Sequence, residues 1–125
     1  MRRLLALVFL VGFVAAAAGA GVRGSHGAQT TGDEPHYLLT AHSLAQDGDL
    51  DVADDYGGRE YVPFHEPTLD PQAKPLEDGR QVEPHDPLLP ALLAGPLAAG
   101  GWVGAKLALA VLAGALASLL LWVAV

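Results

Sequence analysis

The stretch 107-LALAVLAGALASLLLWVAV-125 contains no charged residue over 19 positions. A second stretch of the same length, 4-LLALVFLVGFVAAAAGAGV-22, is also free of charge. A helix rises 1.5 Å per residue, so each stretch would extend about 28 Å, close to the thickness of the hydrocarbon core of a bilayer. The sequence therefore predicts two transmembrane helices, one near each end of the chain.

The charges of the chain are unevenly distributed along its length. All 14 acidic residues and all five histidines lie between Gly24 and Gly100, where only three basic residues occur, so this region has a formal charge of −11. Arg2 and Arg3 precede the first apolar stretch, and the positive-inside rule therefore places the N-terminus in the cytoplasm and the acidic region outside. Arg23, after the first stretch, weakens this asymmetry.

The composition excludes several classes of function. An acidic region repels the phosphates of nucleic acid, which is excluded as a partner, whereas a divalent cation or a cationic ligand would suit it. The chain has no cysteine, which excludes a disulfide framework, a thiolate metal site and a cysteine nucleophile. With 125 residues, of which 51% are hydrophobic and gathered in blocks, the chain has room for one small domain in contact with the lipid bilayer.

The N-terminal stretch has a second interpretation. Arg2 and Arg3, the apolar core and the small residues 15-AAAAGAGV-22 together also fit a secretory signal peptide. The apolar run is long for a signal core, which favours an uncleaved transmembrane helix or signal anchor over residues 1–23. Both interpretations export the acidic region.

A helix is predicted directly after residue 33. Asp33 is suited to cap its N-terminus, and Glu34 and Pro35 are both favoured in a first turn. Apolar residues then follow on one helical face, namely Tyr37, Leu38, Ala41, Leu44 and Ala45. Gly48 is suited to end the helix. We expect an amphipathic helix over about residues 34–46, lying near the membrane surface.

The remaining residues of the region 24–86 are expected to complete an extracytoplasmic loop. Residues 24–32 (GSHGAQTTG) are typical of a linker. Residues 47–86 contain five prolines and little periodicity, which predicts an irregular, exposed loop. Within it, 60-EYVPF-64 is compatible with a short extended segment.

Residues 87–101 (PLLPALLAGPLAAGG) are apolar but interrupted by proline and glycine. They predict a short interfacial or re-entrant helix over about residues 88–99, followed by a turn at the two final glycines. Residues 102–125 then form the second transmembrane helix. The predicted fold is an all-α membrane protein in which two transmembrane helices flank an extracytoplasmic loop with juxtamembrane helices.

The chain ends at Val125 within an apolar run, with no polar residue after it. A natural C-terminus at such a position is unusual. We therefore expect the chain to be a fragment of a larger polytopic fold, located in the cell membrane.

Asp33 and Glu34 are the candidate catalytic residues. One interpretation is structural, because a capping residue and an acid near a helix N-terminus together stabilise a helix by about 1 kcal/mol or somewhat more. The other is functional, because a carboxylate held at the membrane face can act as a general base on an acceptor hydroxyl or bind a divalent cation beside a phosphate.

The histidines are His26, His36, His42, His65 and His85. They show no HxH or HExxH spacing, so no zinc site is predicted. His36 follows Asp33 by one helical turn and is placed to orient a carboxylate or contact a phosphate, and His85 is placed to reach a headgroup. An ordinary surface position is the alternative for each histidine.

The acidic run 47-DGDLDVADD-55 partly resembles a calcium-binding loop. Three of its aspartates fit positions 1, 3 and 5 of an EF-hand, but Val52 and Gly58 occupy the places of the required glycine and glutamate. We interpret the run as a solvated acidic turn and predict no metal site there. Tyr37 and Tyr56 are interpreted as packing residues.

The order of these features resembles a known family. An N-terminal membrane helix is followed by 32-GDEPHY-37, by 43-SLAQDGDL-50, by an interrupted apolar segment after His85 and by a second membrane helix. This order is similar to the N-terminal end of integral-membrane glycosyltransferases of the GT-C superfamily, in particular the bacterial branch related to protein mannosyltransferases and aminoarabinose transferases. The segment 85-HDPLLPALLAGPLAAGG-101 is similar to the second juxtamembrane helix of that family, although Leu88 stands where the family has glycine.

The resemblance implies a function and a site. Enzymes of this family transfer a sugar from a polyprenyl-phosphate donor on the outer face of the membrane, and their first external loop carries an Asp-Glu pair. The resemblance therefore implies that Asp33 is the catalytic base with Glu34 as its neighbour. The candidate substrate-binding residues are His36, Tyr37 and His85. The family has many more than two membrane helices, which implies that this chain alone is inactive.

Two other functions fit the same residues. The chain can be a non-catalytic two-helix membrane protein with an acidic external binding loop, or an exported, lipid-associated protein whose signal peptide is cleaved. The identity of the sugar, the acceptor and any need for a divalent cation stay open.

Overall fold

The computed structural model of the chain describes residues 1–24 and 28–125. Four helices follow one another in the described residues, which contain no strand: α1 (Arg2–Ala17), α2 (Glu34–Gln46), α3 (Ala53–Gly58) and α4 (Leu88–Ala124). The all-α class expected from the sequence is thus observed. The chain forms two units, a helix pair (Met1–Val22 with Val103–Val125) and a loop unit (Arg23–Trp102).

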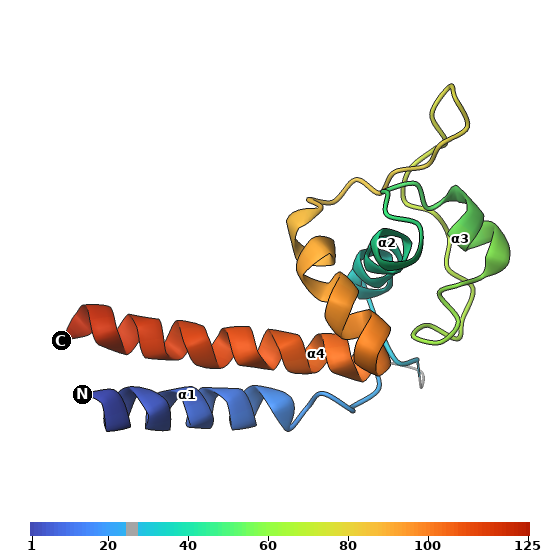
Figure 1. Cartoon of the computed structure of the whole chain (residues 1–125). Helices are drawn as coiled ribbons and strands as arrows, with labels where there is room; N and C mark the ends of the chain where they lie inside the picture. The colour runs from blue at the N-terminus through green and yellow to red at the C-terminus, as the bar shows by residue number, and fades with distance from the viewer. Residues whose placement is uncertain (25–27) are drawn as a thin grey trace. The chain divides into compact units, whose positions relative to one another are not determined.

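In the helix pair, α1 lies alongside the C-terminal part of α4 (Figure 1). Small residues allow the two backbones to come close, because a Cβ atom at Gly114 would lie 2.7 Å from the carbonyl oxygen of Phe9. A Cβ atom at Gly12 would lie 3.2 Å from the Cα atom of Gly114. A polar contact also joins the helices, since the Ser118 hydroxyl donates a hydrogen bond of 2.9 Å to the carbonyl of Leu5.

Apolar side chains cover the outside of the helix pair. No residue of α1 is buried, and large apolar side chains are exposed on both helices, among them Leu7, Leu10, Leu116, Leu120 and Trp122. In the described part of the chain, one helix, α4, is long and apolar enough to cross a membrane, with a mean hydropathy of 2.4. Exposed apolar surface of this extent is typical of contact with lipid or with another protein.

The N-terminal helix is shorter than the uncharged stretch over residues 4–22. Helix α1 ends at Ala17 and has 16 residues, so it extends about 24 Å, and turns follow over residues 18–21. The expectation of a helix through Val22 was wrong. The reason is the alternation of alanine and glycine over residues 18–21, because each glycine weakens a helix by about 1 kcal/mol relative to alanine. A second membrane span stays a prediction.

Helix α4 changes direction at two glycines, as the sequence predicts. Gly100 (φ −139°, ψ 15°) and Gly101 (φ 60°, ψ −159°) are not helical, and the helix resumes after them. The backbone of Gly101 occupies a region that residues with a Cβ atom essentially never adopt. The preceding helical segment begins at Leu88, whose backbone N–H donates a hydrogen bond of 2.8 Å to the carboxylate of Asp86. The predicted helix over residues 88–99 is therefore present.

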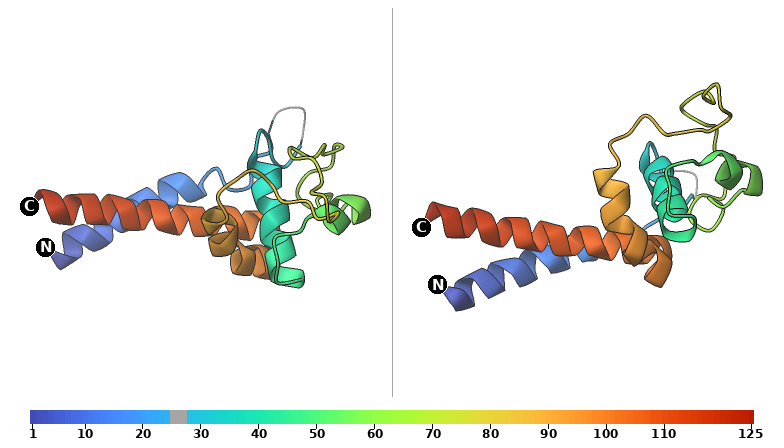
Figure 2. Two further views of the ribbon diagram at one scale, coloured as in Figure 1. Left: turned by 90° about the horizontal axis from the view of Figure 1, so that it is seen from above. Right: turned by 45° about the horizontal axis from the view of Figure 1, so that its top comes forward.

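Helix α2 forms the centre of the loop unit and lies between α3 and the N-terminal segment of α4 (Figure 2). Its observed bounds, Glu34–Gln46, agree with the prediction, and Gly48 follows it with φ 79°. The predicted amphipathic surface helix is wrong in one respect, because most sides of α2 are covered. The buried residues include His36, Thr40 and Ser43 outside the predicted apolar face, whereas Ala45 on that face is exposed.

The segment over residues 47–86 is mostly exposed and irregular, as expected, but part of it forms α3 and packs on α2, which the sequence did not predict. It contributes α3 and several fully or nearly buried side chains, namely Val52, Tyr61, Phe64, Leu69, Asp55, Gln81 and Glu83. Leu38 and Leu39 of α2 and Leu93 and Leu97 of α4 are buried as well. Residues 60–64 form consecutive turns rather than an extended segment.

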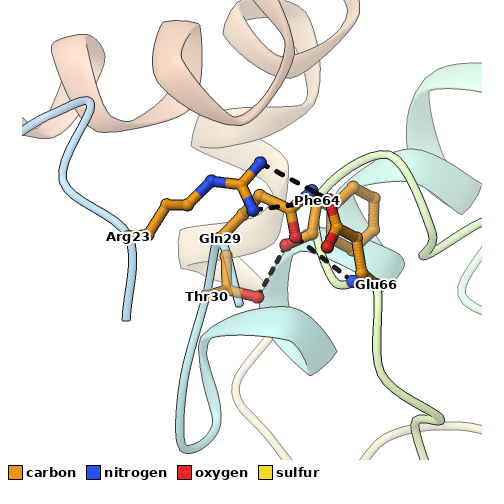
Figure 3. A network of polar contacts seen from close by, with 5 residues as sticks. All are labelled: Arg23, Gln29, Thr30, Phe64 and Glu66. Atoms are coloured by element: carbon orange, nitrogen blue, oxygen red, sulfur yellow. Dashed lines mark hydrogen bonds and ion pairs between the residues drawn. The ribbon is translucent and has the colours of Figure 1, made fainter. Parts of the chain in front are cut away.

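Polar contacts connect the start of the loop unit to residues 64–66 (Figure 3). The Thr30 hydroxyl donates a hydrogen bond of 2.8 Å to the carbonyl of Phe64, and the side-chain amide of Gln29 exchanges hydrogen bonds of 3.2 Å with Glu66. Arg23 also contacts the Glu66 carboxylate at 3.4 Å, but both side chains are exposed, so this ion pair contributes little stability. Of the predicted linker, residues 25–27, with His26, lie outside the described residues, and residues 28–30 are buried.

We predict that Gly114→Ala destabilises the helix pair. The added Cβ atom would meet the carbonyl oxygen of Phe9 at 2.7 Å, and overpacking of this kind costs about 1–3 kcal/mol. Thermal unfolding of the full chain in micelles, followed by circular dichroism, would measure the loss. Gly19→Ala is the matched control, because a Cβ atom there meets nothing within 4 Å. Equal melting temperatures for the two variants would contradict the close contact.

Candidate functional site

Asp33 and Glu34 lie at the start of α2. Asp33 is exposed, and its carboxylate accepts a hydrogen bond of 2.8 Å from the side-chain amide of Gln72. It occupies the N-cap position without a side-chain cap, so the predicted capping by its carboxylate is wrong. Glu34 instead accepts a hydrogen bond of 3.4 Å from the backbone N–H of Thr31. The Asp33 carboxylate is therefore directed outward from the helix start.

A chain of hydrogen bonds lies in the interior, one turn further along α2. Nδ1 of His36 is 2.8 Å from the hydroxyl oxygen of Tyr56, and that hydroxyl donates a hydrogen bond of 2.5 Å to Oε1 of Glu83. Nδ1 of His36 also lies 3.5 Å from the same carboxylate oxygen. The Tyr56 hydroxyl donates its only proton to Glu83, so its oxygen can only accept in the contact with His36. We therefore assign Nδ1 of His36 as the donor in that contact.

The electrostatics of this hydrogen-bond chain favour an ionised glutamate. Burial alone would raise the pKa of Glu83, but hydrogen bonds with His36 and Tyr56 and the nearby histidines outweigh it, so the pKa is lowered. Burial, followed by the hydrogen bond to Glu83, raises the pKa of Tyr56, which therefore stays a neutral donor. The Glu83 side chain is 1% exposed and that of His36 is 6% exposed, so water contributes little to stabilising the charge.

Tyr37 and His85 extend the same cluster. Their rings stack with centroids 4.5 Å apart, and the rings of His85 and His36 lie 6.3 Å apart. Nε2 of His85 and Oε2 of Glu83 are buried and have no hydrogen-bond partner within the described residues. Buried polar atoms without a partner are costly, so these two atoms are positions at which a ligand group or water would be favourable.

The structure thus brings together three of the five candidate residues, His36, Tyr37 and His85. Asp33 lies four positions before Tyr37, at the N-cap of α2, and its carboxylate contacts Gln72 instead of the cluster. The carboxylate that His36 contacts is Glu83 and not Asp33. The candidate site therefore consists of an exposed carboxylate at the helix start and a buried cluster of aromatic and histidine side chains one turn away.

The sequence interpretation missed two members of the cluster. Tyr56 was interpreted as a packing residue, and Glu83 was not considered. No sequence signal marks Glu83, because Gln81 and Glu83 are buried while the apolar Val82 between them is exposed. A polar–apolar alternation would have predicted the opposite side as the covered one.

The acidic run over residues 47–55 is held by its own hydrogen bonds. The Asp49 carboxylate accepts from the N–H of Asp51, at 2.9 Å, and the Asp51 carboxylate accepts from the N–H groups of Ala53, at 3.1 Å, and Gln81, at 2.9 Å. Among residues 1–24 and 28–125, no group of three or more metal-ligating side chains is arranged to hold a metal ion. These aspartates shape the chain around α3.

Asp55 differs from the other aspartates because it is buried. Its side chain is 3% exposed, and Oδ1 lies 3.8 Å from Nε2 of His42. Burial, together with the surrounding carboxylates, raises its pKa from 3.8 to about 7. Near neutral pH this carboxyl group is therefore divided between its protonated and ionised forms.

Comparison with known proteins adds no assignment. No family model matches the chain, and no curated protein and no solved structure matches it. The resemblance to glycosyltransferases therefore depends on the short motifs around Asp33 and His85, and its implications are proposals.

We predict that Tyr56→Phe lowers the free energy of unfolding by about 1–3 kcal/mol, because Glu83 and His36 lose their shared partner in the interior. Urea titration in micelles, followed by near-ultraviolet circular dichroism, would measure the loss. Tyr37→Phe is the matched control, since the hydroxyl of Tyr37 makes no hydrogen bond within the described residues and the ring stacking on His85 is kept. Equal losses in both variants would contradict the role of Tyr56.

We predict that Asp55→Asn stabilises the protein at pH 8. The unfolded carboxyl ionises near 3.8 and the folded one near 7, so the stability of the wild-type protein falls as the pH rises through this range. The variant lacks this loss, and each 1 kcal/mol regained raises the melting temperature by roughly 4–8 °C in a domain of this size. Melting temperatures at pH 4, 6 and 8 should diverge from the wild type as the pH rises. Asp70→Asn, at an exposed position, should follow the wild type.

Proposed function

We propose that the chain is the N-terminal part of a membrane glycosyltransferase that moves a sugar from a polyprenyl-phosphate donor to an acceptor on the outer face of the membrane. The observation that carries this proposal is the exposed carboxylate of Asp33 at the start of α2, in a folded unit inserted between two apolar helices. The chain alone is proposed to be inactive, because the resemblance implies further membrane helices.

The proposed topology is that of a multi-pass protein of the cell membrane. The helix pair would lie in the bilayer, which accounts for the apolar side chains exposed on both helices. Arg2 and Arg3 support a cytoplasmic N-terminus, and the acidic residues 24–100 then lie outside the cytoplasm. Helix α1 spans the hydrocarbon core in this proposal with Arg2 and Arg3 reaching the headgroups, since long basic side chains extend to the interface.

Asp33 is proposed as the general base. Its hydrogen bond to the neutral amide of Gln72 orients the carboxylate without neutralising its charge. Glu34 is its neighbour in the first turn, and the N-terminus of a helix favours a nearby donor phosphate. An exposed carboxylate in this position can accept the proton of an acceptor hydroxyl during transfer.

His36, Tyr37 and His85 are proposed to bind the substrate. The support is the stacked pair of Tyr37 and His85 together with the buried Nε2 of His85, which has no partner within the described residues. A sugar hydroxyl or a phosphate oxygen would satisfy that nitrogen. The proposal assigns no divalent cation to this cluster.

A second candidate function is a non-catalytic membrane protein whose acidic external loop binds a partner. It is favoured by the folding of residues 23–102 around a core of their own, with exposed carboxylates at the surface. In this candidate Asp33 would contribute only to the surface charge.

We predict that Asp33→Asn reduces sugar transfer by about 10²–10⁴-fold, the usual contribution of a general base. The assay uses the longest protein whose reading frame contains these residues, in membrane vesicles, with a polyprenyl-phosphate-linked radioactive sugar. Glu77→Gln, which removes an exposed carboxylate elsewhere in the loop, should transfer at the normal rate.

Two results would decide against the enzyme proposal. Normal transfer by the Asp33→Asn protein would remove this residue from the mechanism. Absence of transfer by the unsubstituted protein with several polyprenyl-phosphate sugars would favour the second candidate.

A further inference from the structure

An acidic cleft lies on the loop unit, apart from the cluster around His36. It has a volume of about 450 Å³ and is lined by His42, Gln46, Asp47, Asp54, Asp55 and Glu60. These residues belong to α2, to α3 and to the chain just after each helix. The lining contains four carboxyl groups and no lysine or arginine, so no lysine or arginine of the cleft neutralises their negative charge.

One carboxylate in this cleft is buried and incompletely satisfied. The Asp55 side chain is 3% exposed, Oδ1 is 3.8 Å from Nε2 of His42, and Oδ2 has no hydrogen-bond partner within the described residues. A buried carboxylate oxygen without a donor is costly, and the cost is relieved when a donor binds. This oxygen is therefore the position at which a cationic donor would gain most.

A second, more apolar cleft adjoins the acidic one. It has a volume of about 230 Å³ and shares His42, Gln46 and Glu60 with the acidic cleft. Its other side is formed by apolar and aromatic residues, including Phe64 and Trp102. A molecule that occupies both clefts would have a positive end and an apolar end.

We propose that these adjoining clefts bind an organic cation, a protonated amine carried on an apolar group. The ammonium would contact Asp55 and Glu60, and the apolar group would lie against Phe64 and Trp102. An organic ligand is favoured over a metal ion because no group of three or more ligating side chains in the described residues is arranged for a metal. This binding site is separate from Asp33 and stands whether or not the chain belongs to a glycosyltransferase.

The site makes binding depend on pH. Asp55 is faced by Asp54 of α3, by Asp47 and Asp49 after α2, by Glu60 and by His42, and its pKa is raised to about 7 by burial and by these carboxylates. A bound ammonium favours the ionised form, so binding releases the proton of Asp55. Affinity should therefore rise by about tenfold between pH 6 and pH 8, as the carboxylate becomes ionised.

The test uses 2-phenylethylamine, which is positively charged at both pH values, and its neutral analogue 2-phenylethanol. The full chain is placed in micelles of an uncharged detergent and carries Trp122→Phe, so that Trp102 is the remaining tryptophan. Titration of the amine should give a saturable change in the fluorescence of Trp102. The alcohol should bind at least about tenfold more weakly, a difference of about 1.4 kcal/mol.

Asp55→Asn in the same background should weaken binding of the amine by about tenfold or more and remove its pH dependence. Its melting curve at pH 8 shows that any loss of binding is not a loss of folding. Asp70→Asn, an exposed position outside the clefts, should bind as the unsubstituted protein does.

Three results would overturn the proposal. They are equal binding of amine and alcohol, unchanged binding by Asp55→Asn, and displacement of the amine by calcium chloride at constant ionic strength. The last would assign the cleft to a metal ion.

Discussion

The hydroxyl group of Tyr56 holds the loop unit together. It contacts His36, 20 positions earlier, and Glu83, 27 positions later, so three segments meet at one oxygen atom. Each partner alone would be a polar group placed in the interior at a cost, and the shared hydroxyl satisfies Nδ1 of His36 and Oε1 of Glu83. The position of α2 depends on these hydrogen bonds of the Tyr56 hydroxyl, and the orientation of Asp33 at the start of α2 depends on them as well.

Local signals were sufficient to predict the helices that begin and end at distinctive residues. Helix α2 lies between Asp33 and Gly48 as expected, and α4 begins at Leu88 and bends at Gly100 and Gly101. In each case the residues that predict the boundary lie within a few positions of it. They are an acidic residue or a proline where a helix begins, and a glycine where it ends or bends. The end of α1 at Ala17 was missed because the uncharged stretch continues past Gly19 and Gly21, which weaken a helix without interrupting the hydrophobic run.

The chain between α2 and α4 could not be predicted in this way. Its order comes from contacts between distant residues, such as Gln29 with Glu66, at 37 positions, and Tyr56 with Glu83. Prolines and charges in this segment correctly indicated a mostly exposed, irregular chain, but nothing local marks Asp55 as buried among the neighbouring aspartates. The candidate site was predicted in part, because His36 and Tyr37 share a helix, while Glu83 joins them only through the fold.

The two glycines at the bend of α4 have different consequences for the tolerance of the chain to sequence variation. No atom lies within 4 Å of a Cβ position at either glycine, so neither is required for lack of space. Gly100, with φ −139°, is in a region that any residue adopts, whereas Gly101, with φ 60° and ψ −159°, is restricted to glycine by its backbone alone. In a library of all single substitutions, position 101 would accept only glycine, whereas the neighbouring position 100 would accept other residues. The cause of this difference is the chirality of L-amino acids and not the packing around position 101.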